Sequence, residues 1–368
     1  MEQLERKQVK DSIATKRIEE GGIIMGDGIG IHSTGIYEPK QVVNVEDIKL
    51  EEGISEEKIK KLGIERLRVA SESEHPSTMA INAARSAIEV GDINPLDIDL
   101  VVYTQAFFSD HLIWPDYAEI QKEIGAVNAN SLKILQQCNG QVAAIDYVYS
   151  KMVADRSVNV ALIVGAEKYC KPLMNRWKSS NTAFWGDGAS AAIIKRGVLN
   201  NEILGTSLAT DGTYNRIWQA SYKGGTELPF SNEVKLEKDE MLADFVRSGG
   251  VYQTDDNMRK IIVDSMISKN NQVLTNILKN MSENIKITKV VTINLGINWA
   301  NQVGQTLNVS LENTSGYVAK DYAHMGACDL IFNLHKMRED GRIQSGDNVV
   351  LFSSGAGYSS GSVLISYL

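Results

Sequence analysis

Short apolar runs alternate with amphipathic helical patterns along most of the chain. The apolar runs at residues 28–31, 100–104, 158–164 and 191–194 are rich in β-branched side chains and nearly free of charge. Runs of this kind are typical of strands that helices cover on both faces. The pattern therefore predicts an α/β fold built around a largely buried sheet.

The second half of the chain repeats the order of the first. The segment IDLVVYTQA around Val101 resembles TKVVTINLG around Val290, and VNVALIVGAE around Val160 resembles DNVVLFSSGA around Val349. Both pairs are 189 residues apart, because 290 minus 101 and 349 minus 160 give the same number. Two matches at one offset indicate an internal duplication. We therefore expect two similar halves, residues 23–198 and 199–368, after a charged N-terminal arm at residues 1–22.

Cys138 lies where a short apolar run ends and a helical pattern begins. The apolar face of that helical pattern consists of Val142, Ile145, Val148 and Met152. A helix N-terminus favours the thiolate form of a cysteine, and its N–H groups can hold an oxyanion. A buried cysteine that acts only as a small hydrophobic residue is the commoner case. The surroundings of Cys138 alone therefore favour the buried hydrophobic role.

The offset of the duplication suggests a partner for this cysteine. Adding 189 to 138 gives 327, inside the segment AHMGACD, which contains His324 and Asp329. If the halves pack about a pseudo-twofold axis, the two turns face each other. A nucleophile needs a base, and a histidine oriented by an aspartate is suited to that task. An ordinary turn histidine and an aspartate at a helix start are the alternatives, and spacing alone does not choose.

Two glycine-rich segments follow predicted strands or turns. The segment WGDGASAAII at 185–194 resembles a phosphate loop only loosely, since it lacks a GKS or GKT sequence. The segment SSGAGYSSGS at 353–362 contains Gly355, Ala356 and Gly357. Glycines there allow close approach of backbone to a ligand or to another strand. A tight turn and an oxyanion site are both compatible with it.

The amino-acid composition excludes some classes of binding partner and some cellular locations. Among 368 residues, 38 are Lys or Arg and 46 are Asp or Glu, which gives a net charge of -8. This charge argues against a nucleic-acid backbone or an anionic membrane as the main partner. No apolar run is long enough to span a bilayer, and the first twenty residues are too charged for a signal peptide. The three cysteines form neither a metal motif nor an even disulfide set, so we expect free thiols, no metal and a cytoplasmic location.

Five motifs in register resemble the thiolase superfamily, specifically its beta-ketoacyl-ACP synthase III branch. They are GIHSTGIYEPKQVV, LGIERLRVA, QQCNG, GDGASA and SSGAGYSSGSVLI, and they run from about Gly28 to the C-terminus. The resemblance implies a five-layered αβαβα fold made of two pseudo-duplicated halves and a homodimer. It also implies that Cys138 is the residue acylated by a thioester, with acyl-phosphopantetheine as the donor and no permanently bound cofactor.

The departures from the family pattern concern the other catalytic residues. Family ketosynthases use a Cys-His-Asn set, but Asn294 stands here at or next to the position of the family histidine. His324 falls at the position of the family asparagine. His324 and Asp329 together are similar to acyltransferring offshoots of the branch, which make esters or amides rather than carbon–carbon bonds. Asn294 can still donate a hydrogen bond, so condensation stays open.

Further departures concern the donor and the acyl group. Family members that prefer CoA stack its adenine on a tryptophan, where this chain has Glu57, with Lys61 near a family arginine. An acyl carrier protein is therefore the favoured donor, with CoA as the alternative. Trp114 falls where the family places an aromatic residue that closes the partner subunit's acyl pocket, which suggests a short acyl group.

These observations favour an acyltransferase that works through a thioester on Cys138 and passes a short acyl group to a small-molecule acceptor with a hydroxyl, amine or other nucleophile. The setting would be fatty acid or natural-product biosynthesis. Two alternatives stay open. One is a decarboxylating synthase of the ketoacyl-ACP synthase III type. The other is a partner subunit of a heterodimeric ketosynthase.

Overall fold

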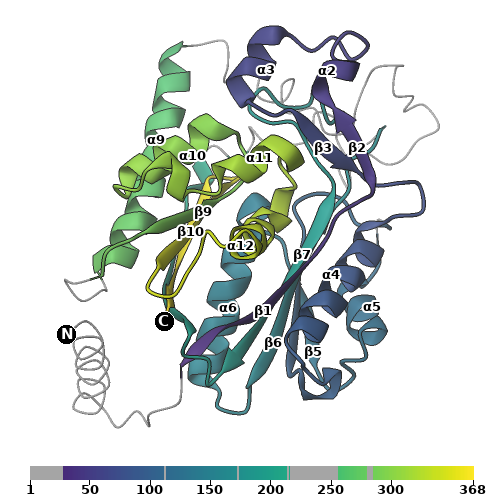
Figure 1. The fold of residues 1–368 in the computed structure, drawn as a ribbon, viewed down its shortest axis with the longest axis vertical. Helices are drawn as coiled ribbons and strands as arrows, with labels where there is room; N and C mark the ends of the chain where they lie inside the picture. Colours follow the sequence, from purple (N-terminus) through teal and green to yellow (C-terminus); the bar gives the residue numbers. More distant parts are fainter. Residues whose placement is uncertain (1–27, 112, 172–173, 214, 216–255, 280–284) are drawn as a thin grey trace.

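The computed structural model describes residues 28–111, 113–171, 174–213, 215, 256–279 and 285–368. The predicted arm at residues 1–22 lies outside these ranges. The main feature is a nine-stranded sheet in the order β5-β4-β6-β7-β1-β8-β11-β10-β9, and a second sheet pairs β2 with β3. Figure 1 shows the strands running through the middle of the molecule with helices on either side.

The elements of the first half include every strand that the apolar runs predicted. They are β1 (Ile29–Tyr37), β2 (Gln41–Asn44), α2 (Val45–Ile48), α3 (Glu56–Leu62), β3 (Arg66–Val69), α4 (Pro76–Val90), η1 (Pro95–Asp97), β4 (Leu100–Thr104), α5 (Asp116–Glu123), β5 (Asn130–Ile134), η2 (Gln137–Asn139), α6 (Gly140–Ala154), β6 (Val160–Glu167) and β7 (Gly188–Arg196). The predicted strands at 28–31 and 191–194 are longer in the structure, because pairing between β1 and β7 extends them.

The elements of the second half follow a similar but not identical order. They are β8 (Asn201–Thr210), α9 (Asp256–Lys279), β9 (Lys289–Thr292), α10 (Ile297–Thr306), η5 (Leu311–Asn313), α11 (Gly316–Tyr322), η6 (Gly326–Cys328), α12 (Asp329–Glu339), β10 (Asn348–Gly355) and β11 (Ser359–Tyr367). No helix in the described ranges is both long enough and apolar enough to span a membrane.

The two halves have the same local topology. Strand β4 pairs in parallel with β6, and β9 pairs in parallel with β10. The third strand of each set, β7 or β11, is antiparallel to its neighbour. The 3-10 turns η2 and η6 are 189 residues apart, since 326 minus 137 and 328 minus 139 both equal 189. The offset read from the strands thus also relates the turns. The domain boundaries themselves stay a prediction, with residues 197–200 linking β7 to β8.

Helices α6 and α12 occupy the middle layer. Their apolar faces share one core cluster with inward-facing residues of strands from both halves, among them Ile163 and Leu351. On the outer face of the first half, α4 and α5 cover residues such as Val101 and Leu162. On the outer face of the second half, α9 and α10 cover Val350 and its neighbours. The strands of the two halves, joined between β1 and β8 at the pair Gly30 and Glu202, lie on either side of α6 and α12, so the layers are αβαβα, as expected.

Candidate active site

Cys138 lies in η2, which leads directly into α6, so the predicted position at a helix start is confirmed. Its side chain is 8% exposed. The preceding residue, Gln137, has a φ of +51°, a left-handed conformation that residues other than glycine rarely adopt. The position 189 residues later is Gly326, with a φ of +58°. Strain of this kind concentrates at functional sites, and here the left-handed turn immediately precedes the thiol.

The thiol of Cys138 meets the imidazole of His324, although 186 residues separate them in the chain. The distance from Cys138 Sγ to His324 Nε2 is 3.0 Å. The other ring nitrogen, Nδ1, lies 2.5 Å from Asp329 Oδ2. All three side chains are buried. The three groups thus form a continuous hydrogen-bonded chain from thiol to carboxylate, the arrangement that nucleophile activation requires.

The turn that carries His324 is fixed by backbone pairing with residues 184–186, which lead into the GDGASA segment. The N–H of His324 donates to Phe184 O, and the N–H of Gly186 donates to His324 O, both at 3.0 Å. The indole of Trp185 lies against the imidazole, with 4.9 Å between ring centroids and 33° between the planes. The sequence suggested no contact between Trp185 and His324. Residues 184–186 therefore position the histidine.

Asp329 is held by more donors than His324 alone. Its Oδ1 accepts the backbone N–H of Met325 at 2.8 Å, and its Oδ2 accepts the backbone N–H of Asn294 at 2.7 Å. The Asn294 amide nitrogen also faces Asp329, at 3.5 Å, while its oxygen accepts a hydrogen bond from Asn333. Sequence reasoning considered Asn294 as a donor to an enolate. In the structure its donors are directed to Asp329 instead.

The charges around His324 favour the imidazolium form. Burial by itself lowers the pKa of His324, but the charges of Cys138 and Asp329, and their hydrogen bonds, outweigh burial and raise it well above its usual value. A proton held on His324 faces the sulfur and stabilises a thiolate there. Among the described residues, no group of three or more His, Cys, Asp or Glu side chains is arranged to hold a metal ion.

The end of β10 lies against the nucleophile turn. A Cβ atom on Gly355 would lie 3.0 Å from the backbone nitrogen of Asn139 and 3.3 Å from that of Cys138, so this close approach favours glycine. The Ser353 hydroxyl donates to the carbonyl of Cys138 at 2.8 Å. Ala356 and Gly357 lie in the turn between β10 and β11. The oxyanion role suggested for Gly355, Ala356 and Gly357 stays a prediction.

The other residues named from the sequence lie outside this hydrogen-bonded chain. Trp114 is half-buried in the segment before α5, and its ring contacts that of His111 at 5.4 Å between centroids. Glu57 and Lys61 are exposed on α3. Their suggested roles, in closing a partner's acyl pocket and in weakening CoA binding, stay predictions.

Two buried side chains beside the His324 turn were not suggested by the sequence. Glu167, at the end of β6, accepts hydrogen bonds from the backbone N–H groups of Ala106 and Ala327. Burial raises the pKa of the Glu167 carboxyl to about 8, although these hydrogen bonds lower it. Tyr169 is 1% exposed, and its ring lies 5.0 Å from that of Trp185. Glu167 is the last residue of the buried apolar strand β6, and Tyr169 follows it closely. A polar side chain at the end of such a strand is the sequence feature from which both could have been predicted as site residues.

Gly326 should not tolerate a side chain. A Cβ atom there would lie 2.5 Å from the Tyr169 hydroxyl and 2.9 Å from Glu167 Cγ. We expect Gly326→Ala to lower the free energy of unfolding by about 3 kcal/mol or more, since a buried overlap adds to the strain of a positive φ. Gly341→Ala is the matched control, because Gly341 has a φ of +66° but no atom within 4 Å of its Cβ position. Equal losses in urea denaturation would contradict the overlap.

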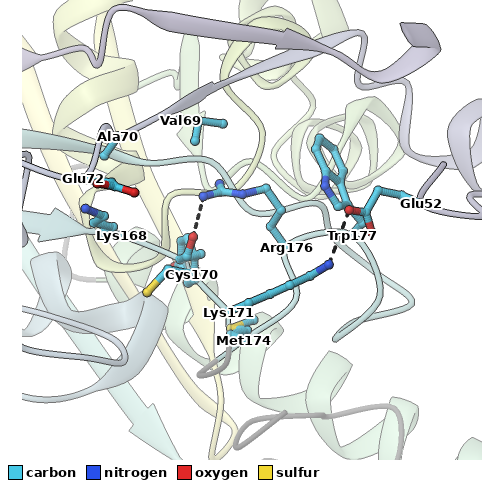
Figure 2. Close-up of a pocket in the computed structure, with 11 residues that line it drawn as sticks. Glu52, Val69, Ala70, Glu72, Lys168, Cys170, Lys171, Met174, Arg176 and Trp177 are labelled. Carbon is cyan, nitrogen blue, oxygen red and sulfur yellow. Dashed lines mark hydrogen bonds and ion pairs between the residues drawn. The ribbon is translucent and has the colours of Figure 1, made fainter. Parts of the chain in front are cut away.

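A cavity of about 590 Å³ is lined in part by Tyr169, and Figure 2 shows residues of its wall. Its lining includes Glu52, Lys168, Tyr169, Lys171, Met174 and Arg176. Figure 2 shows Lys171 reaching toward Glu52, with 3.5 Å between Nζ and Oε1. The partly buried Arg176 forms an ion pair with the buried Asp187 of the GDGASA segment at 2.9 Å. Asp187 thus connects the GDGASA segment to the wall of the cavity. The described contacts of this segment do not support its loose resemblance to a phosphate loop.

Comparison with known protein families identifies two matching regions. The family described as 3-Oxoacyl-[acyl-carrier-protein (ACP)] synthase III matches residues 132–212. The family described as the C terminal part of that synthase matches residues 279–367. The first region contains Cys138, and the second contains Asn294, His324 and Asp329.

Similar full-length proteins carry names that agree with these families. The beta-ketoacyl-[acyl-carrier-protein] synthase III of Wolbachia pipientis wMel is 27% identical over 346 residues, which cover 92% of this chain and 98% of that protein. The synthase of the same name from Aquifex aeolicus is 25% identical over 343 residues, covering 92% of this chain and all of that protein.

Solved structures share the fold at lower identity. A structure described as the acyltransferase ChlB3 superposes with a TM-score of 0.81 at 19% identity, covering 93% of this chain and 98% of that one. The 3-oxoacyl-[acyl-carrier-protein] synthase III of Aquifex aeolicus VF5 gives a TM-score of 0.73 at 22% identity, covering 92% and 100%. These likenesses establish the fold.

Proposed function

The chain belongs to the beta-ketoacyl-ACP synthase III-like branch of the thiolase superfamily, and on this premise we propose that it is an acyltransferase acting through a thioester on Cys138. The observation that carries the proposal is the hydrogen-bonded chain from Cys138 through His324 to Asp329. In this proposal Cys138 is the nucleophile, His324 the base and Asp329 the carboxylate that orients the base, and acyl transfer needs such a set together with an oxyanion site.

The first step loads the acyl group. The Cys138 thiolate attacks the thioester carbonyl of an acyl-phosphopantetheine donor, so that a carbon–sulfur bond to Cys138 forms and the carbon–sulfur bond to the donor breaks. The departing pantetheine thiolate takes a proton from the His324 imidazolium. This proton is available because the pKa of His324 is raised in the free enzyme. Loading therefore ends with a neutral imidazole beside an acylated sulfur.

The second step uses the change in charge that acylation produces. Acylation removes the negative charge of Cys138, which is the largest influence raising the pKa of His324. The imidazole then becomes a base at neutral pH and takes the proton from an acceptor hydroxyl or amine. The acceptor oxygen or nitrogen bonds to the acyl carbon, and the bond to Cys138 sulfur breaks. The returning thiolate restores the ion pair with His324.

The oxyanion formed in both steps needs a donor at the nucleophile turn. The N–H of Cys138 belongs to the start of the η2–α6 segment, where backbone donors have no partner within the helix. Gly355 brings the end of β10 to the same place without a side chain. We assign the oxyanion site to this corner, between the Cys138 turn and β10.

The acyl donor and the oligomeric state can be proposed on the same basis. The family names specify an acyl carrier protein, and the exposed Glu57 and Lys61 of α3 offer no aromatic platform for adenine. We propose an acylated carrier protein as donor, a short acyl group, a small-molecule acceptor and a homodimer in the cytoplasm.

Decarboxylative condensation is the second candidate, and the names of the full-length relatives favour it. A condensing site must stabilise an enolate, which calls for well-placed donors beyond the base. In the described residues the donors of Asn294 are directed to Asp329. This arrangement favours transfer to oxygen or nitrogen over condensation.

The test is to incubate the protein with acetyl-loaded carrier protein and then, separately, with malonyl-loaded carrier protein. We expect intact-mass spectrometry to show one added acetyl group and no CO2 to be released from the malonyl extender. Release of CO2 with formation of a ketoacyl product would establish condensation instead. Absence of any covalent acyl group would refute both candidates.

The pH dependence of thiol alkylation should report the ion pair. In the wild type, the imidazolium keeps Cys138 reactive as the pH falls below neutrality, because the pKa of His324 is raised rather than lowered. In His324→Ala, the thiol has no such partner, so its rate should fall with decreasing pH as for an ordinary cysteine. At pH 6.5 we expect iodoacetamide to react about tenfold or more slowly with the variant. Parallel profiles for both proteins would contradict the ion pair.

A further inference from the structure

Three polar groups around His324 are buried without a hydrogen-bond partner among the described residues. They are the indole N–H of Trp185, the hydroxyl of Tyr169 and the Oε2 oxygen of Glu167. Each belongs to a side chain that is at most 2% exposed. An unpaired buried polar group costs free energy, so native proteins rarely keep one without a reason. Three such groups gather beside one reactive imidazole, and a substrate bound there would supply their partners.

The three groups border one region of the molecule. The indole of Trp185 lies against the imidazole of His324, and the Tyr169 ring lies against the indole. The Tyr169 hydroxyl and the Glu167 side chain both lie over Gly326, two residues after His324. Of these residues, Tyr169 also lines the cavity described above.

The chemistry of these groups defines what they can recognise. An indole N–H only donates, and a tyrosine hydroxyl donates while it is neutral. Burial keeps Tyr169 neutral by raising its pKa well above the usual value. With a pKa of about 8, the Glu167 carboxyl is largely protonated at neutral pH, so it too can donate. A set dominated by donors requires a ligand with oxygen acceptors, which an alkyl chain does not offer.

We infer that the site selects a substrate with a hydroxyl or carbonyl oxygen a few bonds from the reacting atom, and that Trp185 and Tyr169 are the specificity-determining residues that bind this oxygen. The inference rests on the proposed acyl transfer. The oxygen belongs either to the acyl group or to the acceptor, and the chemistry of recognition is the same in both cases.

The first arm of the test measures loading. The protein is mixed with the pantetheine thioester of acetate, butyrate or 3-hydroxybutyrate, and acylation of Cys138 is followed by intact-mass spectrometry. Butyryl and 3-hydroxybutyryl differ by one hydroxyl group. If the acyl group carries the oxygen, we expect 3-hydroxybutyryl to load about tenfold or more faster than butyryl, because a site built to bond an oxygen rejects the analogue that lacks it.

The second arm measures transfer from acetyl-loaded protein. The acceptor probes are 1-propanol and 1,3-propanediol, and the corresponding amines propylamine and 3-aminopropanol. If the acceptor carries the oxygen, the probe with the additional hydroxyl should discharge the acyl group about tenfold or more faster. Equal rates within every matched pair, in both arms, would overturn the inference while leaving the proposed function intact.

Two variants test whether Trp185 and Tyr169 bind the substrate oxygen. Tyr169→Phe and Trp185→Phe each remove one donor and keep an aromatic ring, so the ratio within a matched pair should fall toward one. The ratio is used because it cancels a general loss of activity. Tyr367→Phe is the matched control: its hydroxyl is also buried and unpartnered, but it lies at the end of β11 away from Gly355. An unchanged ratio in both site variants would overturn the inference, and absence of loading in the wild type would overturn the proposed function with it.

Discussion

Replacing Cys138 by alanine should abolish the acyl-enzyme. We expect no added acyl mass on Cys138→Ala after incubation with acylated carrier protein, and a loss of transfer of at least about 10⁴-fold, because Cys138 is the nucleophile that forms the proposed covalent intermediate. The other two cysteines do not offer a substitute. Cys328 is fully buried and donates to Met325 O. Cys170 is exposed and does not take part in the hydrogen bonds that link Cys138, His324 and Asp329.

Cys170→Ala is the matched control for this experiment. It removes an exposed thiol of the same chemical type and should keep the added acyl mass. Peptide mapping of the acylated wild type should place the group on the peptide that contains Cys138. An acyl group that persists on Cys138→Ala would remove the basis of the proposed mechanism.

Replacing Asp329 by asparagine should be nearly as damaging, although the change in shape is minimal. In the native site the carboxylate accepts the Nδ1 proton of His324 and the backbone N–H groups of Asn294 and Met325. An amide would turn an NH2 group toward one of these donors, and it would no longer hold the imidazole in the required orientation. We expect transfer to fall by about 10³- to 10⁴-fold, as when the buried acid of a catalytic triad is neutralised.

The same substitution should also change the pH dependence. Because Asp329 helps to raise the pKa of His324, its loss should lower that pKa. Loading needs the protonated imidazole, so the rate of loading should begin to fall at a lower pH in the variant than in the wild type. Asp340→Asn, at the other end of α12, is the matched control and should retain activity, since Asp340 only accepts a bond from Tyr317 near the surface. Near-normal transfer by folded Asp329→Asn would show that the carboxylate does not orient the base.

Much of the architecture could be predicted because it depends on local pattern. Buried strands require apolar runs, so the runs around Val101, Val160 and Val349 gave the strands and their repeat. The common offset then placed the turn of His324 opposite that of Cys138. The family resemblance added the expectation that both turns belong to one site. The observed distance of 3.0 Å between sulfur and nitrogen agrees with that expectation.

The direction of individual side chains could not be predicted in the same way. An asparagine at position 294 offers a donor in any fold, and only the position of Asp329 shows where that donor is used. Likewise, the indole of Trp185 contacts His324 because two segments pair across the molecule through their backbones. Such contacts join residues far apart in the chain, so they cannot be predicted from a local sequence pattern.

By itself, the sequence determined a duplicated α/β chain with a cysteine at a helix start and a histidine and an aspartate at the equivalent turn. These features follow from burial and turn chemistry, which act on neighbouring residues. Only the tertiary structure decided that Asn294 supports Asp329, and that three buried polar groups around His324 lack partners within the described residues. The reason is that hydrogen-bond partners in a core are set by how distant segments pack, and packing is a property of the whole fold.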